Sequence, residues 1–306
     1  MSAINPERHD VLIGVIVLDY NDPTATKQCI DSVKSCSNVR CYVVNNGSRV
    51  EGQYSSLPDS IIIENECNLG FSAGMNIGIR RAMKDGCNYF VLMNNDCIAT
   101  PAAIPLLISA LDSDPSLGLV APNRRWSGLA DSPKQNFSAI TNSKNYDQQD
   151  SLVGHSPEIS HQESLTGFCL ATRLDILVNV GPLDEDFFFG KEDDELSFRI
   201  LSRGYWLGEV KNSIIRHRLN GSINFESEES LSFLVYHSSR GRALLAKKMK
   251  TSPFLQLVGS FFDTFRVLVK SLLLRKKFLP SLMRCSFEGF LAGLRLEVTS
   301  NPSNRW

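Results

Sequence analysis

One segment of the chain combines an apolar strand pattern with side chains suited to binding a cation. Residues 89–93 form an apolar run of β-forming residues, and Asn94, Asn95 and Asp96 follow it. In open α/β sheets, ligands bind just outside the carboxyl ends of the strands. Carboxylate and amide oxygens suit a hard divalent cation such as Mg²⁺. A turn rich in Asn and Asp also explains these residues, so the interpretation depends on the rest of the chain.

Two earlier apolar runs also end in polar side chains. Asp19 and Tyr20 follow the first run, and Asn45 ends the second, just before the pair Asn46-Gly47. Because Asn and Gly both tolerate the backbone of tight turns, a turn and a ligand contact are equally compatible with that pair. Both segments are expected at the same edge of the sheet as the first one.

Glycine recurs at every fourth residue in the segment that follows Asn68. Gly70, Gly74 and Gly78 therefore lie along one side of the beginning of a helix. Such a side lets a flat nucleotide approach closely, and it equally allows a helix to pack closely on a sheet. The chain has no GxxxxGK[ST] pattern, which disfavours a P-loop nucleotide-binding protein.

A cluster of four carboxylates, at 192–195, begins a predicted helix. Acidic residues stabilise a helix N-terminus, and Glu195 can pair with Arg199 four residues later. Three phenylalanines at 187–189 precede the cluster, and an apolar environment raises the pKa of a carboxyl group. Such a group can serve as a general base near neutral pH. His217 ends a later strand pattern and is either structural or a further ligand for a metal or phosphate.

Alternating strand and helix patterns must position these side chains. The predicted strands cover 11–18, 41–44, 61–63, 89–93 and 117–120, and the predicted helices cover 23–36, 72–83 and 101–111. Alternation of this kind predicts an α/β fold with a mainly parallel central sheet and helices on both faces. We expect one domain over 1–230, in which the polar residues 126–163 form a mobile loop, and a helical extension over 231–306.

The composition is that of an ordinary globular protein and excludes few functions. The chain has 306 residues, of which 42% are hydrophobic and 21% are charged, and a net charge of −1 gives no reason to expect a nucleic-acid partner. The 8 cysteines form no CxxC pair, and several lie in or beside apolar runs, which indicates reduced, buried thiols. Residues 1–10 contain no apolar signal core, so we expect a cytoplasmic protein.

The C-terminal extension is basic and amphipathic. Residues 240–306 carry 13 Lys and Arg but 3 Asp and Glu. Apolar residues recur there at helical spacing, at Phe254, Leu257, Val258, Phe261, Phe262, Phe265, Leu268, Val269 and Leu272. Asp263, Arg266 and Lys270 interrupt the run too often for a spanning helix, which needs ~20 largely apolar residues. We expect a helix that lies on an anionic membrane surface, with packing against the domain as the alternative.

Taken together and in order, these segments resemble inverting family 2 glycosyltransferases with the GT-A (Rossmann-like) fold. The nearest resemblance is to bacterial rhamnosyltransferase-like members that build cell-surface polysaccharide such as O-antigen. The matching segments are VLDYN at 17–21, VVNNGS at 43–48, NLGF at 68–71, LMNND at 92–96, GFCL at 167–170, GPLDEDFF at 181–188 and ED at 192–193. Each motif is weak by itself, but the ordered set is specific.

The resemblance implies transfer of a sugar from a nucleotide diphosphate donor, first of all rhamnose from dTDP-rhamnose, to a polyprenyl-linked saccharide at the inner face of the cell membrane. It assigns the catalytic base to Asp193, with Glu192 beside it, and a Mg²⁺ or Mn²⁺ site to Asp96 and His217. The residues expected to contact the nucleotide are Asp19, Tyr20, Asn45, Asn68, Gly70, Asn94 and Asn95.

The chain departs from the family pattern at three positions. Asn45 and Asn94 stand where the family usually has Asp, which affects the choice of nucleotide and the strength of metal binding. Glu195 replaces a second Asp of the helix that carries the base. The alternatives are a sugar-nucleotide pyrophosphorylase, disfavoured because no Gly-rich loop bearing Lys or Arg follows the first strand, and an inactive binding module, disfavoured by the intact pair Glu192-Asp193.

Overall fold

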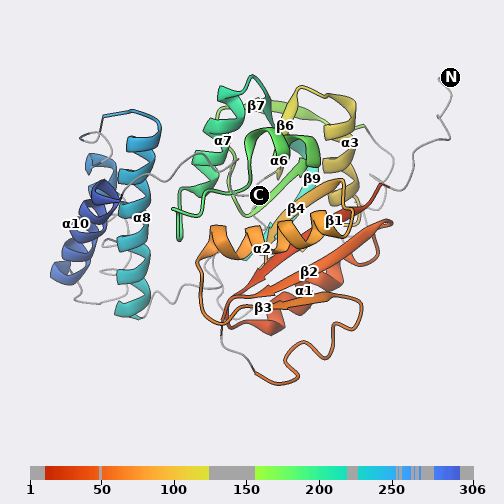
Figure 1. The fold of residues 1–306 in the computed structure, drawn as a ribbon, viewed down its shortest axis with the longest axis horizontal. Coiled ribbons are helices and arrows are strands. Elements are labelled where there is room, and N and C mark those ends of the chain that lie inside the picture. Colours follow the sequence, from red (N-terminus) through yellow and green to blue (C-terminus); the bar gives the residue numbers. More distant parts are fainter. Residues whose placement is uncertain are drawn as a thin grey trace.

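A computed structural model describes residues 11–47, 50–123, 156–218, 227–252, 254, 257–262, 265, 269 and 279–296. Within these ranges, nine strands form one central sheet between helices (Figure 1). The strands are β1 (Ile13–Asp19), β2 (Val39–Asn45), β3 (Ile61–Glu64), β4 (Tyr89–Asn94), β5 (Cys97–Ala99), β6 (Leu117–Asn123), β7 (Ile159–Gln162), β8 (Cys169–Arg173) and β9 (Trp206–His217). The helices are α1 (Pro23–Val33), α2 (Phe71–Lys84), α3 (Ala103–Ser113), α6 (Leu174–Val180), α7 (Glu192–Ser202), α8 (Glu228–Lys248) and α10 (Leu279–Arg295).

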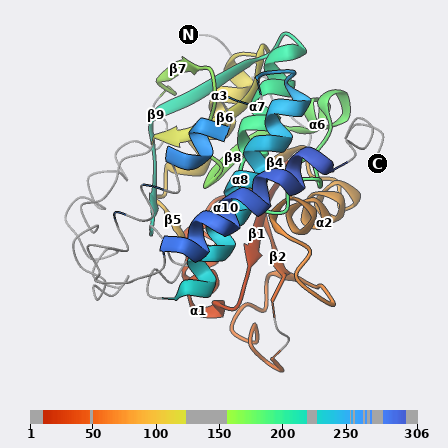
Figure 2. The ribbon, with the colours of Figure 1, turned by 90° about the vertical axis from the view of Figure 1, so that its left-hand side faces the viewer.

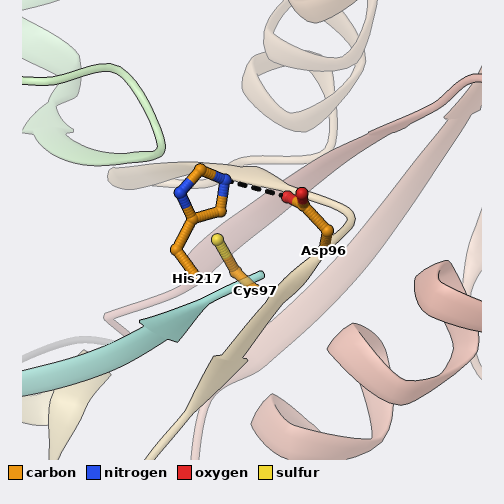
Figure 3. Close-up of side chains that lie close together, drawn as sticks. All are labelled: Asp96, Cys97 and His217. Carbon is orange, nitrogen blue, oxygen red and sulfur yellow. Dashed lines mark ion pairs between the residues drawn. The ribbon is translucent and has the colours of Figure 1, made fainter. Parts of the chain in front are cut away.

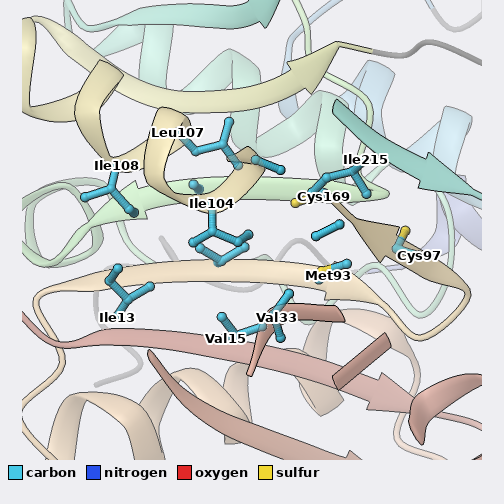
Figure 4. Packing of buried hydrophobic residues seen from close by; sticks show 14 of the residues in the cluster. Ile13, Val15, Val33, Met93, Cys97, Ile104, Leu107, Ile108, Cys169 and Ile215 are labelled. Atoms are coloured by element: carbon cyan, nitrogen blue, oxygen red, sulfur yellow. The ribbon is translucent and has the colours of Figure 1, made fainter. Parts of the chain in front are cut away.

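The central strands are apolar on both faces because helices cover both. On one face, Val15 of β1 belongs to the same buried cluster as Val33 of α1 and Ile104 of α3 (Figure 4). On the other face, Ile16 of β1 shares a cluster with Met75 of α2. Fully burying an aliphatic side chain stabilises a fold by ~1.5–3 kcal/mol. The expected α/β fold with helices on both faces is confirmed.

The strand order brings the predicted polar strand ends together. The sheet runs β3-β2-β1-β4-β8-β6-β9-β5, with β7 also paired to β9. The pairings give six strands a common direction and reverse only β5, β7 and β8 within the described sheet. The register sets Asp19 opposite Asn45, and Leu18 opposite Asn94. The strand order reverses at β1, which is where open α/β sheets bind ligands.

Three elements lie outside the predicted patterns. β5 has three residues, and α6 is a short helix of seven. β7 lies within the segment 126–163, which we expected to be a loop, and pairs antiparallel with β9. Residues 126–155 of that segment lie outside the described ranges.

The helices α8 and α10 form a pair beside the sheet domain (Figures 1 and 2). Ser239 Oγ of α8 and Ser286 Oγ of α10 lie 2.9 Å apart. Gly289 and Gly293 of α10 face the backbone of α8 so closely that a Cβ atom would collide with carbonyl oxygens there. Small residues therefore set the close approach of the two helices. None of the described helices has the length and apolar character that crossing a membrane requires.

Buried charges fix α8 to the sheet domain. The ammonium of Lys248 pairs with the carboxylates of Asp184 and Asp186, and the Lys248 and Asp184 side chains are only 10% and 1% exposed. Arg240 Nη1 also donates to the Asp186 carbonyl at 2.8 Å. Two basic residues of the C-terminal extension, Arg240 and Lys248, therefore bind acidic residues of the sheet domain within the same chain.

Candidate active site

Asp19, at the end of β1, holds the neighbouring turns together. Its Oδ1 accepts hydrogen bonds from Asn95 Nδ2 at 2.9 Å and from the Asp22 amide at 3.1 Å. The Tyr54 hydroxyl donates to its Oδ2. The carboxylate is buried, at 1% exposure, and Asp22 in turn caps α1 through the Ala25 amide. Asp19 and Asn95 therefore frame the expected nucleotide site, and Tyr20, at 49% exposure, is the neighbour that faces outward.

Asn46 organises the second strand end. Its Nδ2 donates to Asn68 Oδ1 and to the Gly70 carbonyl, and its Oδ1 accepts from Asn65 Nδ2 and the Leu69 amide, at 2.9–3.0 Å. All four of these bonds join β2 to the segment that leads into α2. The sequence is compatible with either a turn or a ligand contact at Asn46. In the structure, its side chain instead connects the end of β2 to the segment before α2.

The remaining expected nucleotide contacts lie along the same edge. Asn45 Nδ2 donates to Glu64 Oε2 at 2.7 Å, so a neighbouring strand supplies a carboxylate beside this amide. Asn68 Oδ1 accepts from the Gly70 amide at 2.9 Å. Gly70 has a φ of +84° and faces the Phe188 carbonyl, so only glycine fits there. Gly74 and Gly78, by contrast, face side chains of the sheet, which assigns them to close helix–sheet packing.

Asp96 and His217 form a pair at the turn between β4 and β5 (Figure 3). The antiparallel pairing of β5 with β9 sets Cys97 opposite His217. His217 Nε2 lies 3.0 Å from Asp96 Oδ1, and the imidazole stacks on Phe168 with ring centroids 5.3 Å apart. Asn94 lies beside them, with its Nδ2 3.5 Å from His217 Nε2. Two residues predicted as metal ligands are thus brought together from distant parts of the sequence.

The donor atoms around Asp96 fit a divalent cation. Asn94 Oδ1 is buried and has no hydrogen-bond partner among the described residues, and buried acceptors rarely stay unpaired. A carboxylate and an imidazole, with the Asn94 amide group beside them, together suit Mn²⁺ or Mg²⁺. Cys97 Sγ lies within 4.8 Å of the possible ligand atoms of Asp96 and His217. Burial raises the pKa of the Cys97 thiol, which keeps it protonated, whereas a metal needs the thiolate.

Asp193, in the first turn of α7, is held by backbone amides. Its Oδ2 accepts from the Gly167 amide at 2.8 Å, and its Oδ1 accepts from the Asp194 amide at 2.9 Å. Burial, and next the charge of Asp194, raise the pKa of the Asp193 carboxyl above its ordinary value. The amides fix the orientation of the carboxylate, while burial makes it a stronger base.

Gly167 and Phe168 connect the two chemical centres. Gly167 contacts Asp193, and a Cβ atom at Gly167 would come 3.1 Å from the Asp193 Cβ. Phe168, the next residue, stacks on His217. Two consecutive residues therefore contact the candidate base and the candidate metal ligand, one each.

Glu192 is the most perturbed carboxyl group of the described site. Burial, and next the charge of Asp193, raise its pKa from 4.5 to about 8, and its Oε2 has no hydrogen-bond partner among the described residues. At neutral pH the folded protein therefore keeps a proton on Glu192 that the unfolded chain releases. Because this proton must be retained, Glu192 lowers stability progressively as the pH rises from about 4.5 to about 8.

We expect Glu192→Gln to stabilise the protein at neutral pH. The difference in unfolding free energy should be near zero at pH 4.5 and grow to roughly 3 kcal/mol at pH 7, because each pKa unit corresponds to ~1.4 kcal/mol. Denaturant unfolding of the wild-type protein and of Glu192→Gln across this pH range measures the difference in unfolding free energy. A difference that stays constant with pH would show that Glu192 is ionised in the folded protein.

The phenylalanines before α7 turn toward the C-terminal helices. Phe187 is buried with Leu244 and Leu245 of α8, and Phe188 stacks on His237 of α8. Burial raises the pKa values of Glu192, Asp193 and Glu195, whereas the ring contacts of Phe187 and Phe188 are with α8. The predicted pair of Glu195 with Arg199 is confirmed as a bidentate one, with N–O distances of 2.6 and 2.8 Å.

Sequence patterns did not single out Tyr54, Glu64 or Lys191. Tyr54 lies in a region with no regular pattern, and its bond to Asp19 depends on the fold. Lys191 adopts a φ of +77° before α7 and pairs with Asp194. A hollow of about 450 Å³, lined by Ile13, Asn38 and Pro105 among others, lies at the opposite end of β1 and includes none of the predicted site residues.

Known sequences resemble part of this chain. Residues 14–164 match the family described as "Glycosyl transferase family 2". A protein of Haemophilus influenzae, named as an uncharacterized glycosyltransferase, is 33% identical over 115 residues, which are 34% of this chain and 33% of that protein. The match thus spans a third of the curated relative.

Solved structures resemble it more extensively. GalNAc-T7 with UDP, GalNAc and Mn²⁺ superposes with a TM-score of 0.56 at 15% identity, over 79% of this chain and 48% of that one. Mannosyltransferase PcManGT from Pyrobaculum calidifontis, in complex with GDP-Man and Mn²⁺, has a TM-score of 0.54 at 13% identity, over 94% of this chain and 86% of that one. At these identities the likeness concerns the fold, which is the GT-A fold that the sequence motifs implied.

Proposed function

We propose that this chain, which carries a glycosyl transferase family 2 domain over residues 14–164, is an inverting glycosyltransferase. It moves a sugar, first of all rhamnose from dTDP-rhamnose, from a nucleotide diphosphate donor to a lipid-linked saccharide. One observation carries the proposal: Gly167 contacts a carboxylate of raised pKa, and the next residue, Phe168, contacts an Asp–His pair. A base and an adjacent metal site are what a single displacement at a sugar diphosphate requires.

Asp193 would take the proton from the acceptor hydroxyl. The oxygen of that hydroxyl would attack the anomeric carbon as the bond from this carbon to the nucleoside diphosphate breaks. The Gly167 and Asp194 amides hold the carboxylate in one orientation, and its raised pKa makes it a better proton acceptor. Glu192 stays protonated at neutral pH and so adds no charge of its own to that of Asp194 beside the base. The adjacent Asn94 and His217 side chains would orient the diphosphate end of the donor.

Asp96, His217 and Asn94 would hold Mg²⁺ or Mn²⁺. A divalent cation bound there supplies Lewis-acid stabilisation of the departing diphosphate. Tyr20 is the exposed aromatic beside this edge and would cover the nucleotide base. The solved proteins of this fold that carry UDP or GDP-Man with Mn²⁺ support a nucleotide diphosphate donor, and the choice of dTDP rests on the rhamnosyltransferase-like motifs.

A donor screen tests the proposed reaction. We expect the protein, given dTDP-, UDP- and GDP-sugars with lipid-linked saccharides, to release a nucleoside diphosphate and form a glycoside, with dTDP-rhamnose the best donor. Chelation should abolish both products, and added Mn²⁺ or Mg²⁺ should restore them, because one carboxylate binds the ion weakly.

Each alternative function predicts a different result in the same screen. A pyrophosphorylase would need pyrophosphate and release a sugar 1-phosphate, and a binding module would bind nucleotide without turnover. Full activity after exhaustive chelation would remove the metal from the mechanism.

We also propose that the protein works on the cytoplasmic face of a membrane. The described residues between 254 and 269 are helical, and six of their large apolar side chains are exposed, at Phe254, Val258, Phe261, Phe262, Phe265 and Val269, whereas Leu257 is partly buried. We call this set the C-terminal apolar face. Ser260, on the opposite side, is buried. Leu268, Leu272 and the interrupting charges lie outside the described ranges. The exposure favours a surface-binding helix over packing as core.

Vesicle co-sedimentation tests the membrane proposal. We expect the protein to bind phosphatidylcholine vesicles that contain phosphatidylglycerol, and to bind them more weakly at high salt. Replacing both Phe262 and Phe265 by Asp should weaken binding at least about tenfold, because each buried Phe contributes ~1.5–3 kcal/mol. Trp206→Asp, at an exposed aromatic on β9, is the control. Lys247 and Lys248 make internal contacts, so other basic residues must supply the salt dependence. Equal binding by all variants would reject the C-terminal apolar face.

A further inference from the structure

Aromatic rings from the segment before α7 and from α8 contact one another. Phe188 and Phe189 precede α7, and Phe233 and His237 belong to α8. We call these four residues the aromatic cluster. His237 stacks on Phe188 at a centroid distance of 4.8 Å and an angle of 25°. Phe233 lies 4.4 Å from His237 and 5.7 Å from Phe189.

The aromatic cluster is open to solvent and contains an unpaired polar atom. Phe233 is 40% exposed, and Phe189 is partly exposed. His237 Nδ1 is buried and has no hydrogen-bond partner in the described chain. Burial, and next the charge of Arg240, lower the pKa of His237 to about 4, so the imidazole is neutral at physiological pH. Since buried polar atoms almost always have a partner, this nitrogen lacks a hydrogen-bonding partner of the kind that a bound ligand can supply.

The aromatic cluster adjoins both halves of the candidate site. Phe189 precedes Asp193 by four positions, and the intervening Gly190 and Lys191 turn the chain with positive φ values. Gly241 of α8 packs against the Gly190 carbonyl. The backbone carbonyl of Phe188 accepts a hydrogen bond from the Phe71 amide at 2.6 Å. Phe188 therefore contacts the end of the loop that follows Asn68. The cluster therefore lies between the expected donor loop and the helix that carries the base.

We propose that the aromatic cluster is the acceptor subsite and that it binds a saccharide. The apolar C–H face of a sugar ring would lie on Phe189 and Phe233, while His237 Nδ1 makes a hydrogen bond to a sugar hydroxyl. Ligand sites commonly pair an apolar lining with a few polar groups that orient the ligand. A polyprenyl chain fits the rings but offers nothing to the imidazole. The assignment rests on the proposed transferase function, since it identifies the substrate that must face Asp193.

Binding of simple glycosides tests the subsite without need of turnover. The probes are octyl glycosides of glucose, galactose, mannose, rhamnose and N-acetylglucosamine, with octanol as the apolar reference, and saturation-transfer NMR is the readout. We expect at least one glycoside to receive saturation on its ring protons. Phe233→Ala and His237→Phe should each reduce that signal at least about tenfold, and Phe233→Tyr should retain it. Trp206→Ala is the matched control, because Trp206 is also an exposed aromatic beside a histidine, His161.

The outcomes separate the subsite from the proposed function. Three results would overturn the saccharide subsite. They are saturation confined to the octyl protons, equal signals in wild type and Phe233→Ala, and the absence of signal from every glycoside. Titration of dTDP, UDP and GDP is run in parallel. Glycoside binding that needs Phe233 in a protein that binds none of these nucleotides would keep the subsite and reject the transferase.

Discussion

Replacing Asp193 by Asn should lower the turnover of sugar transfer by on the order of 10²–10⁴-fold and leave donor binding nearly unchanged. The amide keeps the size of the side chain, and its oxygen can still accept a hydrogen bond from the Gly167 amide. The hydrogen bond from the Asp194 amide is lost, because the Asn side chain has one acceptor oxygen, so the variant preserves most of the geometry while removing the proton acceptor. Steady-state kinetics measure the turnover, and calorimetric titration with the nucleotide measures donor binding.

Asp194→Asn is the matched control for this prediction. Asp194 belongs to the same helical turn and accepts a hydrogen bond from Ser164 Oγ at 2.7 Å, and it pairs with Lys191. Partly exposed ion pairs contribute ~0–1 kcal/mol, so turnover should change by less than about fivefold. Near-wild-type turnover of Asp193→Asn would show that Asp193 only stabilises the beginning of α7.

Lys248→Met should destabilise the protein by about 3–5 kcal/mol, because removing one partner of a buried ion pair leaves the other charges uncompensated. Asp184 and Asp186 would lose their shared cation, and α8 would lose its main attachment to the loop before α7. The midpoint of denaturant unfolding, together with its slope, gives the change in free energy.

Lys247→Met separates charge burial from loss of a lysine as such. Among the described residues, the neighbouring Lys247 donates to the Leu294 and Leu296 carbonyls, near the surface. Ordinary hydrogen bonds contribute ~0.5–1.5 kcal/mol, so its loss should cost about 1 kcal/mol. Equal effects of the two substitutions would indicate that the pair with Asp184 adds nothing beyond a surface contact.

The parts of the fold that were predicted from sequence are those with a strong local pattern. The strands β1, β2 and β4 are apolar on both faces, and this pattern survives in any context that buries them. β5 and β7 have three and four residues, and both depend on pairing with β9. Their existence is a property of the assembled sheet.

The candidate site shows the same division. Asp96 and Asp193 are carboxylates that follow apolar residues, which indicated functional side chains. The ordered motifs implied the roles of metal ligand for Asp96 and of catalytic base for Asp193. The contacts that relate them are not local: His217 reaches Asp96 only because β9 pairs with β5, and Gly167 touches Asp193 across the sheet edge. The role of Asn46 was equally hidden, since Asn before Gly looks the same in a free turn and in a residue with four hydrogen bonds.

That arrangement at Asn46 bears on how the protein ages. In an Asn-Gly pair the glycine nitrogen can attack the side-chain amide and expel ammonia, which leaves a carboxylate or an isomerised backbone. Here the Asn46 amide is held on both its oxygen and its nitrogen, and the Gly47 nitrogen donates to Asn45 Oδ1 at 3.1 Å. The folded chain therefore resists this reaction, while an unfolded chain undergoes it freely. A negative charge appearing at position 46 would record the time that a molecule has spent unfolded.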